Sequence, residues 1–329
     1  MSIQRPALLC AALALSLSVL MPASAAKVRP GKAARAVSTA AAGSVLETGM
    51  HLPGYPHAVD VYRPAGATRV IVFLHGHGGY NWQMAFNLGI NRKPKAAVDA
   101  NVDWALLQRL GIIAVFPQGQ AKDAASANTW SNRIFDSGQD DAGFLVALSE
   151  HARAAWGATQ VSLAGHSAGG TMTGRMWCEQ TQAFDAFYSV AGPMPAPSDA
   201  HFNYNCSPTA TAPYAMVVGD QDKLLPMFSA DRVKPTPEQV AAGLVNSTLT
   251  AEWLRHGHRG VAACGELTAL DGSSARAYGP AWQACDGGVQ FTIVRGADHP
   301  MSSIEAKTGE PLLDWIVQFS LDGPSALAR

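Results

Sequence analysis

The chain has 329 residues, of which 48% are hydrophobic and 15% are charged, a composition typical of a globular protein with a sizeable core. Lys and Arg number 24 against 25 Asp and Glu, so neither sign of charge dominates. Proteins that bind nucleic acid usually carry a basic excess, and this balance argues against that class. The length allows one large domain or two small ones.

The first residues have the pattern of an export signal. Arg5 supplies a positive charge, residues 7–20 are almost unbroken apolar sequence, and Ala-Ser-Ala at 23–25 is a small-x-small cleavage pattern. The apolar stretch is shorter than the roughly 20 residues that a membrane-spanning helix needs, so an uncleaved anchor is the weaker alternative. We expect a signal peptide over 1–25, a disordered leader over 26–43, and a secreted or periplasmic mature protein without a membrane anchor.

Strand-like and helix-like segments alternate through the rest of the chain. Alternating residues around Gly54 predict an antiparallel strand pair within 44–63, at one edge of a sheet. Repeated strand–helix–strand units predict an α/β fold with a mostly parallel central sheet and helices on both faces. The predicted strands cover 69–74, 111–116, 159–164, 183–190, 214–218 and 289–294, and the predicted helices cover 96–110, 140–156, 168–180 and 310–319.

A single domain is expected over 44–329, because no linker, internal repeat or second compact module interrupts the alternation. Residues 223–284 have little strand character and one helical stretch near 238–255. We interpret them as an insertion over the functional site and not as a separate domain.

The sequence at 165–169 is Gly-His-Ser-Ala-Gly, placed between a predicted strand and a predicted helix. This is the setting of a nucleophile elbow, in which a strained turn exposes the serine at the carboxyl edge of the sheet. An isolated G-x-S-x-G is a weak signal, and its alternative reading is a tight turn with a solvent-facing serine. The strand before the motif and the glycines after it favour Ser167 as a nucleophile.

A nucleophile of this kind needs backbone donors for the oxyanion of the tetrahedral intermediate. The N–H of Ala168, directly after Ser167, is the first candidate. The second should come from the glycine-rich loop after the strand at 69–74, where the N–H of His77 is favoured and that of Gly78 is next.

The remaining triad members are expected after later strands, the acid first and the histidine second. His299 is the single histidine after the last predicted strand and is the predicted base. Asp222, deep in the loop after 214–218, is favoured as the acid over Asp220, which we expect to brace the turn. Asp298 is a poor orienter because consecutive side chains point apart.

Two residue pairs have a metal-site interpretation that we disfavour. His75 and His77 lack a third local ligand, and catalytic zinc takes three protein ligands. Asp140 and Asp141 open a predicted helix, where both are expected to cap it and to favour its positive end. The sequence therefore predicts no metal and no cofactor.

Four cysteines remain after removal of the signal peptide, namely Cys178, Cys206, Cys264 and Cys285. Their even number in an exported protein predicts two disulfides. Three pairings are possible, and pairing sequence neighbours is preferred because it closes two local loops.

Several of these segments together resemble the poly(3-hydroxybutyrate) depolymerase and feruloyl esterase-like group of α/β-hydrolases, over roughly 54–319. The motifs that carry the likeness are Leu-His-Gly at 74–76 followed by Gly79, Phe-Pro-Gln-Gly at 116–119, Asp-Asp-Ala-Gly-Phe at 140–144, Gly-His-Ser-Ala-Gly-Gly at 165–170, and the loops that end at Asp222 and His299. The resemblance implies the α/β-hydrolase fold, and Cys264 and Cys285 stand where such enzymes often pair cysteines.

The chain departs from this group in two places. Pro300 and Met301 follow His299, whereas the group often has Gly-His-Ala-Trp-Pro at its histidine. Residues 223–284, which would shape the substrate pocket, match weakly. The resemblance therefore supports the reaction class better than the substrate.

The function predicted from the sequence is ester hydrolysis by Ser167, His299 and Asp222. Small or oligomeric esters are the expected substrates, either hydroxyalkanoate oligomers or feruloyl- or acetyl-type esters. Four aromatic residues are candidate lining for an acyl or sugar site, although each is individually more typical of packing: Tyr80, Trp82, Trp130 and Trp282. An acyltransferase with the same triad and a non-catalytic exported binding protein on the same fold are the alternatives.

Overall fold

The computed structural model describes residues 42–95, 97–192, 212–224, 268–269, 279, 281–284 and 288–322. All of them belong to one compact unit that runs from Ser38 to Arg329. The predicted signal peptide, nearly all of the predicted leader and most of the predicted insertion lie outside the described residues, as does the helix expected near 238–255. Within the described ranges, no helix combines the length and the apolar character needed to cross a membrane.

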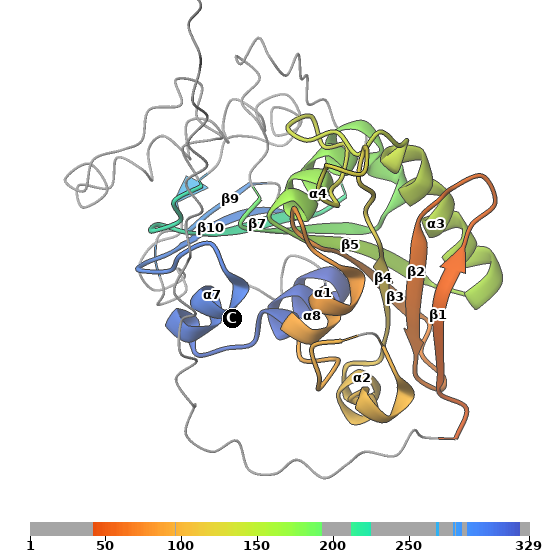
Figure 1. Cartoon of the computed structure of the whole chain (residues 1–329). Coiled ribbons are helices and arrows are strands. Elements are labelled where there is room, and N and C mark those ends of the chain that lie inside the picture. The colour runs from red at the N-terminus through yellow and green to blue at the C-terminus, as the bar shows by residue number, and fades with distance from the viewer. Residues whose placement is uncertain are drawn as a thin grey trace, which may run out of the picture. The chain divides into compact units, whose positions relative to one another are not determined.

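The described strands form one ten-stranded sheet in the order β1-β2-β4-β3-β5-β6-β7-β10-β9-β8 (Figure 1). Their bounds are β1 Val45–His51, β2 Ala58–Arg63, β3 Arg69–Leu74, β4 Ile112–Pro117, β5 Gln160–His166, β6 Ala186–Val190, β7 Tyr214–Gly219, β8 Thr268–Ala269, β9 Ala281–Ala284 and β10 Val289–Val294.

The strands β4, β3, β5, β6, β7 and β10 are adjacent and all run parallel. Antiparallel strands flank this core on both sides: β2 and β1 beside β4, and β9 and β8 beside β10. The carboxyl ends of the six parallel strands meet at one edge of the sheet, where parallel sheets of this kind place their functional loops. The expected strand pair around Gly54 is confirmed as β1 and β2.

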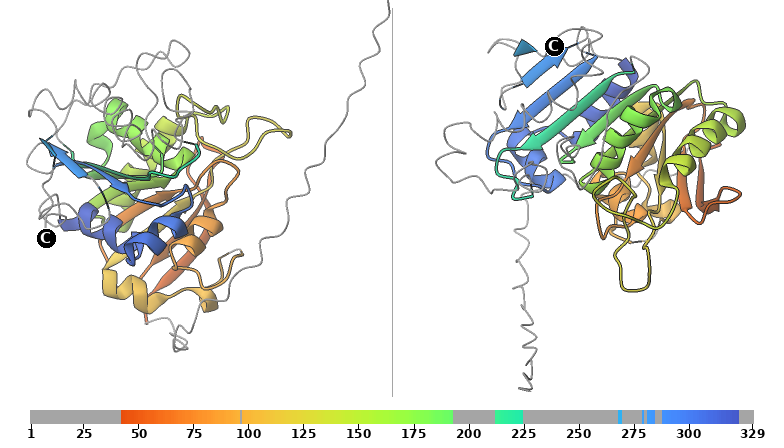
Figure 2. Two further views of the ribbon diagram at one scale, coloured as in Figure 1. Left: turned by 90° about the vertical axis from the view of Figure 1, so that its left-hand side faces the viewer. Right: turned by 90° about the horizontal axis from the view of Figure 1, so that it is seen from above.

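Helices cover both faces of the sheet (Figure 2). Their bounds are α1 Asn81–Asn87, α2 Trp104–Leu110, α3 Asp141–Trp156, α4 Ala168–Glu179, α7 Met301–Thr308 and α8 Leu312–Asp322, with single 3₁₀ turns at Asp99–Asn101 and Thr181–Ala183. One buried apolar cluster joins α3 and α4 to the sheet, and a second joins α1, α2, α7 and α8 to its other face. Successive side chains of β3 point to opposite faces of the sheet and contribute to both clusters: Val70 and Val72 belong to the first, and Ile71 and Phe73 to the second.

The predicted elements agree with the structure most closely in the buried parallel strands. The strands predicted at 69–74 and 289–294 are β3 and β10. The strand expected over 183–190 begins later, at Ala186, after a 3₁₀ turn, and the helix expected from residue 310 begins at Leu312, directly after Pro311. The helices α1 and α7, of seven and eight residues, were not predicted.

The helix predicted over 96–110 is wrong in its first half. The chain makes only a 3₁₀ turn at Asp99–Asn101, and α2 begins at Trp104. Asp103 explains the boundary, because its side chain accepts a hydrogen bond from the N–H of Leu106 at 3.0 Å and so caps the helix there.

Candidate active site

Ser167 lies at a sharp turn between β5 and α4. Its backbone has φ 55° and ψ −121°, a region that residues with a side chain seldom occupy. Such strain persists only where the surroundings impose it, and it places the serine at the carboxyl edge of the sheet. The turn has the geometry that the Gly-His-Ser-Ala-Gly sequence predicts.

Close packing behind Ser167 explains the glycines of the motif. A Cβ on Gly165 would lie 2.2 Å from the carbonyl oxygen of Gly169, and one on Gly169 would lie 2.4 Å from that of Leu74. Both clashes are with backbone, which cannot move aside without separating α4 from β5 and β3. The position of Ser167 therefore requires glycine at both 165 and 169, because any larger residue would carry a Cβ that clashes with backbone.

Three side chains from different loops form a continuous chain of hydrogen bonds. The Oγ of Ser167 is 2.8 Å from Nε2 of His299, and Nδ1 of His299 is 2.7 Å from Oδ2 of Asp222. The Asp222 side chain is almost completely buried, whereas that of His299 is partly exposed to the pocket. In this arrangement Ser167 donates to His299, and the Nδ1–H of His299 donates to Asp222.

The parallel pairing of β7 with β10 brings the acid and histidine loops together. Gly219, which ends β7, pairs with Val294, which ends β10, so the loops that carry Asp222 and His299 leave the sheet side by side. The other two acidic candidates take structural positions. Asp220 accepts the N–H of Gly296 at 2.6 Å and so links the loops, and Asp298 accepts the N–H of His299 at 2.8 Å.

The predicted oxyanion donors both line the pocket of Ser167. Ala168 is the first residue of α4, where a backbone N–H has no acceptor within its helix. In the part of the chain that the structure describes, no acceptor is found for the N–H of His77. The second-ranked candidate, Gly78, is excluded because its N–H donates to the carbonyl oxygen of Asn128 at 2.8 Å.

His75 holds the oxyanion loop in place and both of its ring nitrogens are engaged. Nδ1 lies 2.7 Å from the carbonyl oxygen of Gly76, and Nε2 accepts the N–H of Gly119 at 2.9 Å. Burial lowers the pKa of His75 to about 4, so its ring is neutral near pH 7. His77 instead stacks on Phe135, with ring centroids 4.4 Å apart. The two histidines therefore do not converge on a common point.

Asp140 and Asp141 have different roles, which corrects the prediction that both cap α3. Asp140 is the cap, and its Oδ1 accepts the N–H of Gly143 at 3.0 Å. Asp141 is fully buried and accepts from Nε2 of His57 at 2.6 Å, from the N–H of Ser131 at 2.6 Å and from the hydroxyl of Ser137 at 2.5 Å. It therefore fixes the loop over 118–139.

That loop binds both sides of the oxyanion site. Trp130 is fully buried and donates its indole N–H to the carbonyl oxygen of His75 at 2.9 Å. Asn132, also fully buried, donates to the carbonyl oxygen of Ala168 at 2.7 Å. Sequence reasoning missed His57 and Asn132, because neither stands in a recognisable motif.

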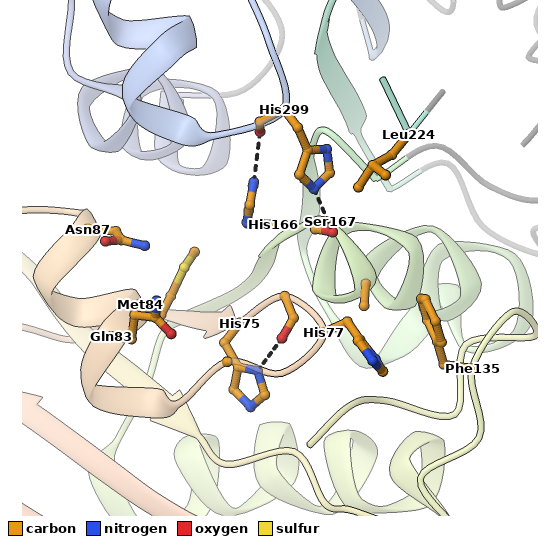
Figure 3. Close-up of a pocket in the computed structure, with 13 residues that line it drawn as sticks. His75, His77, Gln83, Met84, Asn87, Phe135, His166, Ser167, Leu224 and His299 are labelled. Carbon is orange, nitrogen blue, oxygen red and sulfur yellow. Dashed lines mark hydrogen bonds between the residues drawn. The ribbon is translucent and has the colours of Figure 1, made fainter. Parts of the chain in front are cut away.

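A cavity of about 480 Å³ opens over Ser167 and His299 (Figure 3). The lining comes from the oxyanion loop, one face of α1, the elbow and two further loops: His75, Gly76, His77, Gly79, Gln83, Met84, Asn87, Phe135, His166, Ser167, Ala168, Leu224 and His299. Of the four aromatic residues predicted to line the site, Tyr80, Trp82 and Trp130 are not among them. Trp130 is buried, and Tyr80 stacks on Trp82 with ring centroids 5.6 Å apart. The side chain of Trp282 lies outside the described residues.

One of the four cysteines expected in disulfides lies within the described residues. Cys178, near the end of α4, is disulfide-bonded. Cys206, Cys264 and Cys285 lie outside the described residues, so the pairing expected from the sequence stays a prediction. Among the described side chains, no group of three His, Cys, Asp or Glu residues is arranged to hold a metal ion.

No family model and no curated protein matches the sequence. The structure is similar to that of an acetyl xylan esterase from Aspergillus awamori, with a TM-score of 0.50 and 13% identity over 80% of this chain and 99% of that one. A dienelactone hydrolase from Anabaena variabilis has a TM-score of 0.45 and 12% identity over 85% and 98% of the two chains. With the sheet order above, the likeness shows that the chain has the α/β-hydrolase fold.

Proposed function

We propose that this protein is an exported serine hydrolase that cleaves carboxylic esters through an acyl-enzyme on Ser167. The observation that carries the proposal is the unbroken set of hydrogen bonds from Ser167 through His299 to Asp222 in an open cavity. A serine hydroxyl becomes an effective nucleophile when a positioned base accepts its proton, and this geometry supplies that base.

The first half of the reaction makes the acyl-enzyme. As the Oγ of Ser167 bonds to the ester carbonyl carbon, its proton passes to Nε2 of His299. The carbonyl oxygen becomes an oxyanion, and the N–H groups of Ala168 and His77 donate to it. When the intermediate collapses, the bond to the alcohol oxygen breaks, and His299 returns the proton to the departing alcohol.

Water completes the cycle by the same route. It gives a proton to His299 as its oxygen attacks the acyl carbon, and the bond to Oγ then breaks while the proton returns to Ser167. The products are the carboxylic acid and the free enzyme. Asp222 accepts the Nδ1–H of His299 throughout and stabilises the imidazolium that forms twice in each turnover.

A sequence resemblance and a structural similarity support the choice of an ester bond and of the substrate. The chain resembles depolymerases of poly(3-hydroxybutyrate) and feruloyl esterases in the motifs around Ser167, Asp222 and His299. A structural neighbour is named for hydrolysis of acetyl groups on xylan. We therefore propose hydroxyalkanoate oligomers or feruloyl- or acetyl-type esters, met outside the cytoplasm after export by the signal sequence.

The test of this proposal is covalent labelling with a fluorophosphonate, which transfers its phosphonyl group to an activated serine and releases fluoride. We expect one labelled peptide, containing Ser167, and parallel hydrolysis of p-nitrophenyl acetate. Ser167→Ala should lose both while keeping its circular dichroism spectrum. Ser126→Ala, which changes an exposed serine in the loop over 118–139, is the matched control and should retain both labelling and hydrolysis. Undiminished hydrolysis by Ser167→Ala would rule the proposal out.

Product analysis separates hydrolysis from acyl transfer, which would use the same triad. With glycerol added as an acceptor alcohol, a hydrolase releases chiefly the free acid, whereas an acyltransferase forms chiefly the glycerol ester.

A further inference from the structure

The two sides of the cavity differ in chemistry. On one side the lining residues are apolar, with Leu224 exposed and Phe135 stacked on the ring of His77. On the other side lie His166 and the amide side chains of Gln83 and Asn87 (Figure 3). Ser167 lies between these two groups of described residues, so an ester held at its Oγ would meet imidazole and amide groups on one side and Leu224 and Phe135 on the other.

His166 has a tautomer that the hydrogen bonding determines. Its Nε2 is 3.1 Å from the backbone carbonyl oxygen of His299, and a carbonyl can only accept, so Nε2 carries a proton. Burial, and next the nearby charge of His299, lower the pKa of His166 to about 4, whereas the hydrogen bond to the carbonyl of His299 and then the charge of Asp222 act to raise it. The ring is therefore neutral near pH 7, and its Nδ1 holds a lone pair.

The lone pair on Nδ1 faces the cavity beside the nucleophile. Figure 3 shows this second ring nitrogen on the side of the ring away from His299. A Cβ placed on Gly76 would lie 3.4 Å from Nδ1 and 3.1 Å from the Cβ of Ser167, so the two residues border the same space. Among the described residues, no group donates a hydrogen bond to Nδ1, and Nδ1 is not one of the fully buried polar atoms that lack a partner, so it remains accessible.

Two exposed amides extend this polar wall. Gln83 and Asn87 stand four residues apart on α1, and therefore on one face of the helix, with the buried Met84 beside them. Neither amide is hydrogen-bonded in the part of the chain that the structure describes. Each can rotate to donate or accept, whereas Nδ1 of His166 is fixed and can only accept.

We propose that His166, Gln83 and Asn87 form a subsite for a hydroxyl group of the substrate, with the hydroxyl donating to Nδ1 of His166. The inference rests on the ester hydrolysis proposed above and narrows its substrates to esters that carry a hydroxyl near the scissile bond. The hydroxyl belongs either to the acyl chain or to the alcohol, and both give the same contact. The apolar side of the cavity takes the part of the ester without hydroxyls.

Matched ester pairs test the subsite. Methyl 3-hydroxybutyrate is compared with methyl butyrate for a hydroxyl on the acyl chain, and glycerol 1-butyrate with propyl butyrate for a hydroxyl on the alcohol. In at least one pair we expect kcat/KM to be about 3- to 10-fold higher for the hydroxylated ester, the range that a neutral hydrogen bond gives. A ratio near one in both pairs overturns the subsite, whereas no hydrolysis of any of the four esters overturns the proposed function instead.

Three variants test which residues bind the substrate hydroxyl. His166→Phe removes the acceptor Nδ1 and should bring the kcat/KM ratio of the hydroxylated to the unhydroxylated ester to about one. It also removes the hydrogen bond from Nε2 to the carbonyl of His299 and should therefore lower kcat. Asn87→Leu, at an exposed position where folding is not at issue, should lower the ratio as well. Phe86→Ala, on the same helix but outside the cavity lining, is the control and should keep the ratio. A ratio unchanged in both His166→Phe and Asn87→Leu overturns the proposal.

Discussion

His299 has every hydrogen-bonding group of its backbone and side chain engaged. Its N–H donates to Asp298, its carbonyl accepts from His166, and its ring lies between Asp222 and Ser167. Four contacts on one residue leave the imidazole little freedom to rotate. A base held in this way is ready for proton transfer without reorganisation, which is the property that acyl transfer at a serine needs.

The three aspartates near His299 can be distinguished by their amide variants. Asp222→Asn should lower kcat by about 10³- to 10⁴-fold with a small change in KM, because an amide no longer fixes the tautomer of His299 or stabilises its charge. Asp220→Asn and Asp298→Asn keep an oxygen that can accept from the backbone N–H groups of Gly296 and His299, so both should lower kcat far less. The measurement is steady-state kinetics on one p-nitrophenyl ester, with thermal unfolding as the check on folding. Equal losses in Asp220→Asn and Asp222→Asn would contradict our assignment of the acid.

At the scale of elements, the oxyanion site depends on a loop that contributes no predicted catalytic group. The loop over 118–139 holds the carbonyl oxygens of His75 and Ala168 through Trp130 and Asn132. Asp141 in turn holds the loop, through contacts with Ser131 and Ser137 and with His57 near β2. The geometry around Ser167 thus relies on a buried carboxylate at the start of α3.

The pair Asp140 and Asp141 tests this dependence. Asp141→Asn places an amide NH₂ or a weaker acceptor against three donors in a buried site, and should lower the free energy of unfolding by about 3 kcal/mol or more. Asp140→Asn keeps a good helix cap and should change it by less than about 0.5 kcal/mol. Chemical denaturation of both variants gives the two values. Similar small effects would mean that the two residues are equivalent caps, as the sequence alone suggested.

At the scale of the whole molecule, acid stability should depend on buried neutral histidines. The pKa of His75 in the folded protein, about 4, lies below its unfolded value of 6.5, so the unfolded chain binds more protons between these limits. The stability contributed by neutral His75 is therefore complete above about pH 6.5 and is lost as the pH falls through about 4. His166 acts in the same direction, because burial lowers its pKa to about 4 as well.

His75→Gln isolates the contribution of His75, since His166 remains in both proteins. Between about pH 7 and about pH 4, the wild type should lose up to about 3 kcal/mol more unfolding free energy than the variant. Denaturant unfolding at several pH values measures this difference. His51→Gln, which changes an exposed histidine on β1, is the control. Parallel pH profiles for wild type and His75→Gln would show that His75 is not held neutral by the fold.

The sequence by itself determined the strand–helix alternation, the fold class and the candidate residues Ser167, His299 and Asp222. These follow from local signals, because buried parallel strands are continuous apolar runs and because an elbow needs a fixed spacing of small residues. Short elements such as α1 and α7 were missed for the same reason, since seven or eight residues carry too little periodic pattern to identify a helix.

Only the tertiary structure decided which polar residues support the site. Asp141 and His57 are separated by 84 residues along the chain, and His166 and His299 by 133, yet each pair shares a hydrogen bond. The tertiary structure also shows that Trp130 does not line the cavity and that Gly78 is not an oxyanion donor. Such contacts leave no trace in local sequence, because the partner of a buried polar group is set by how distant strands and loops meet at one edge of the sheet.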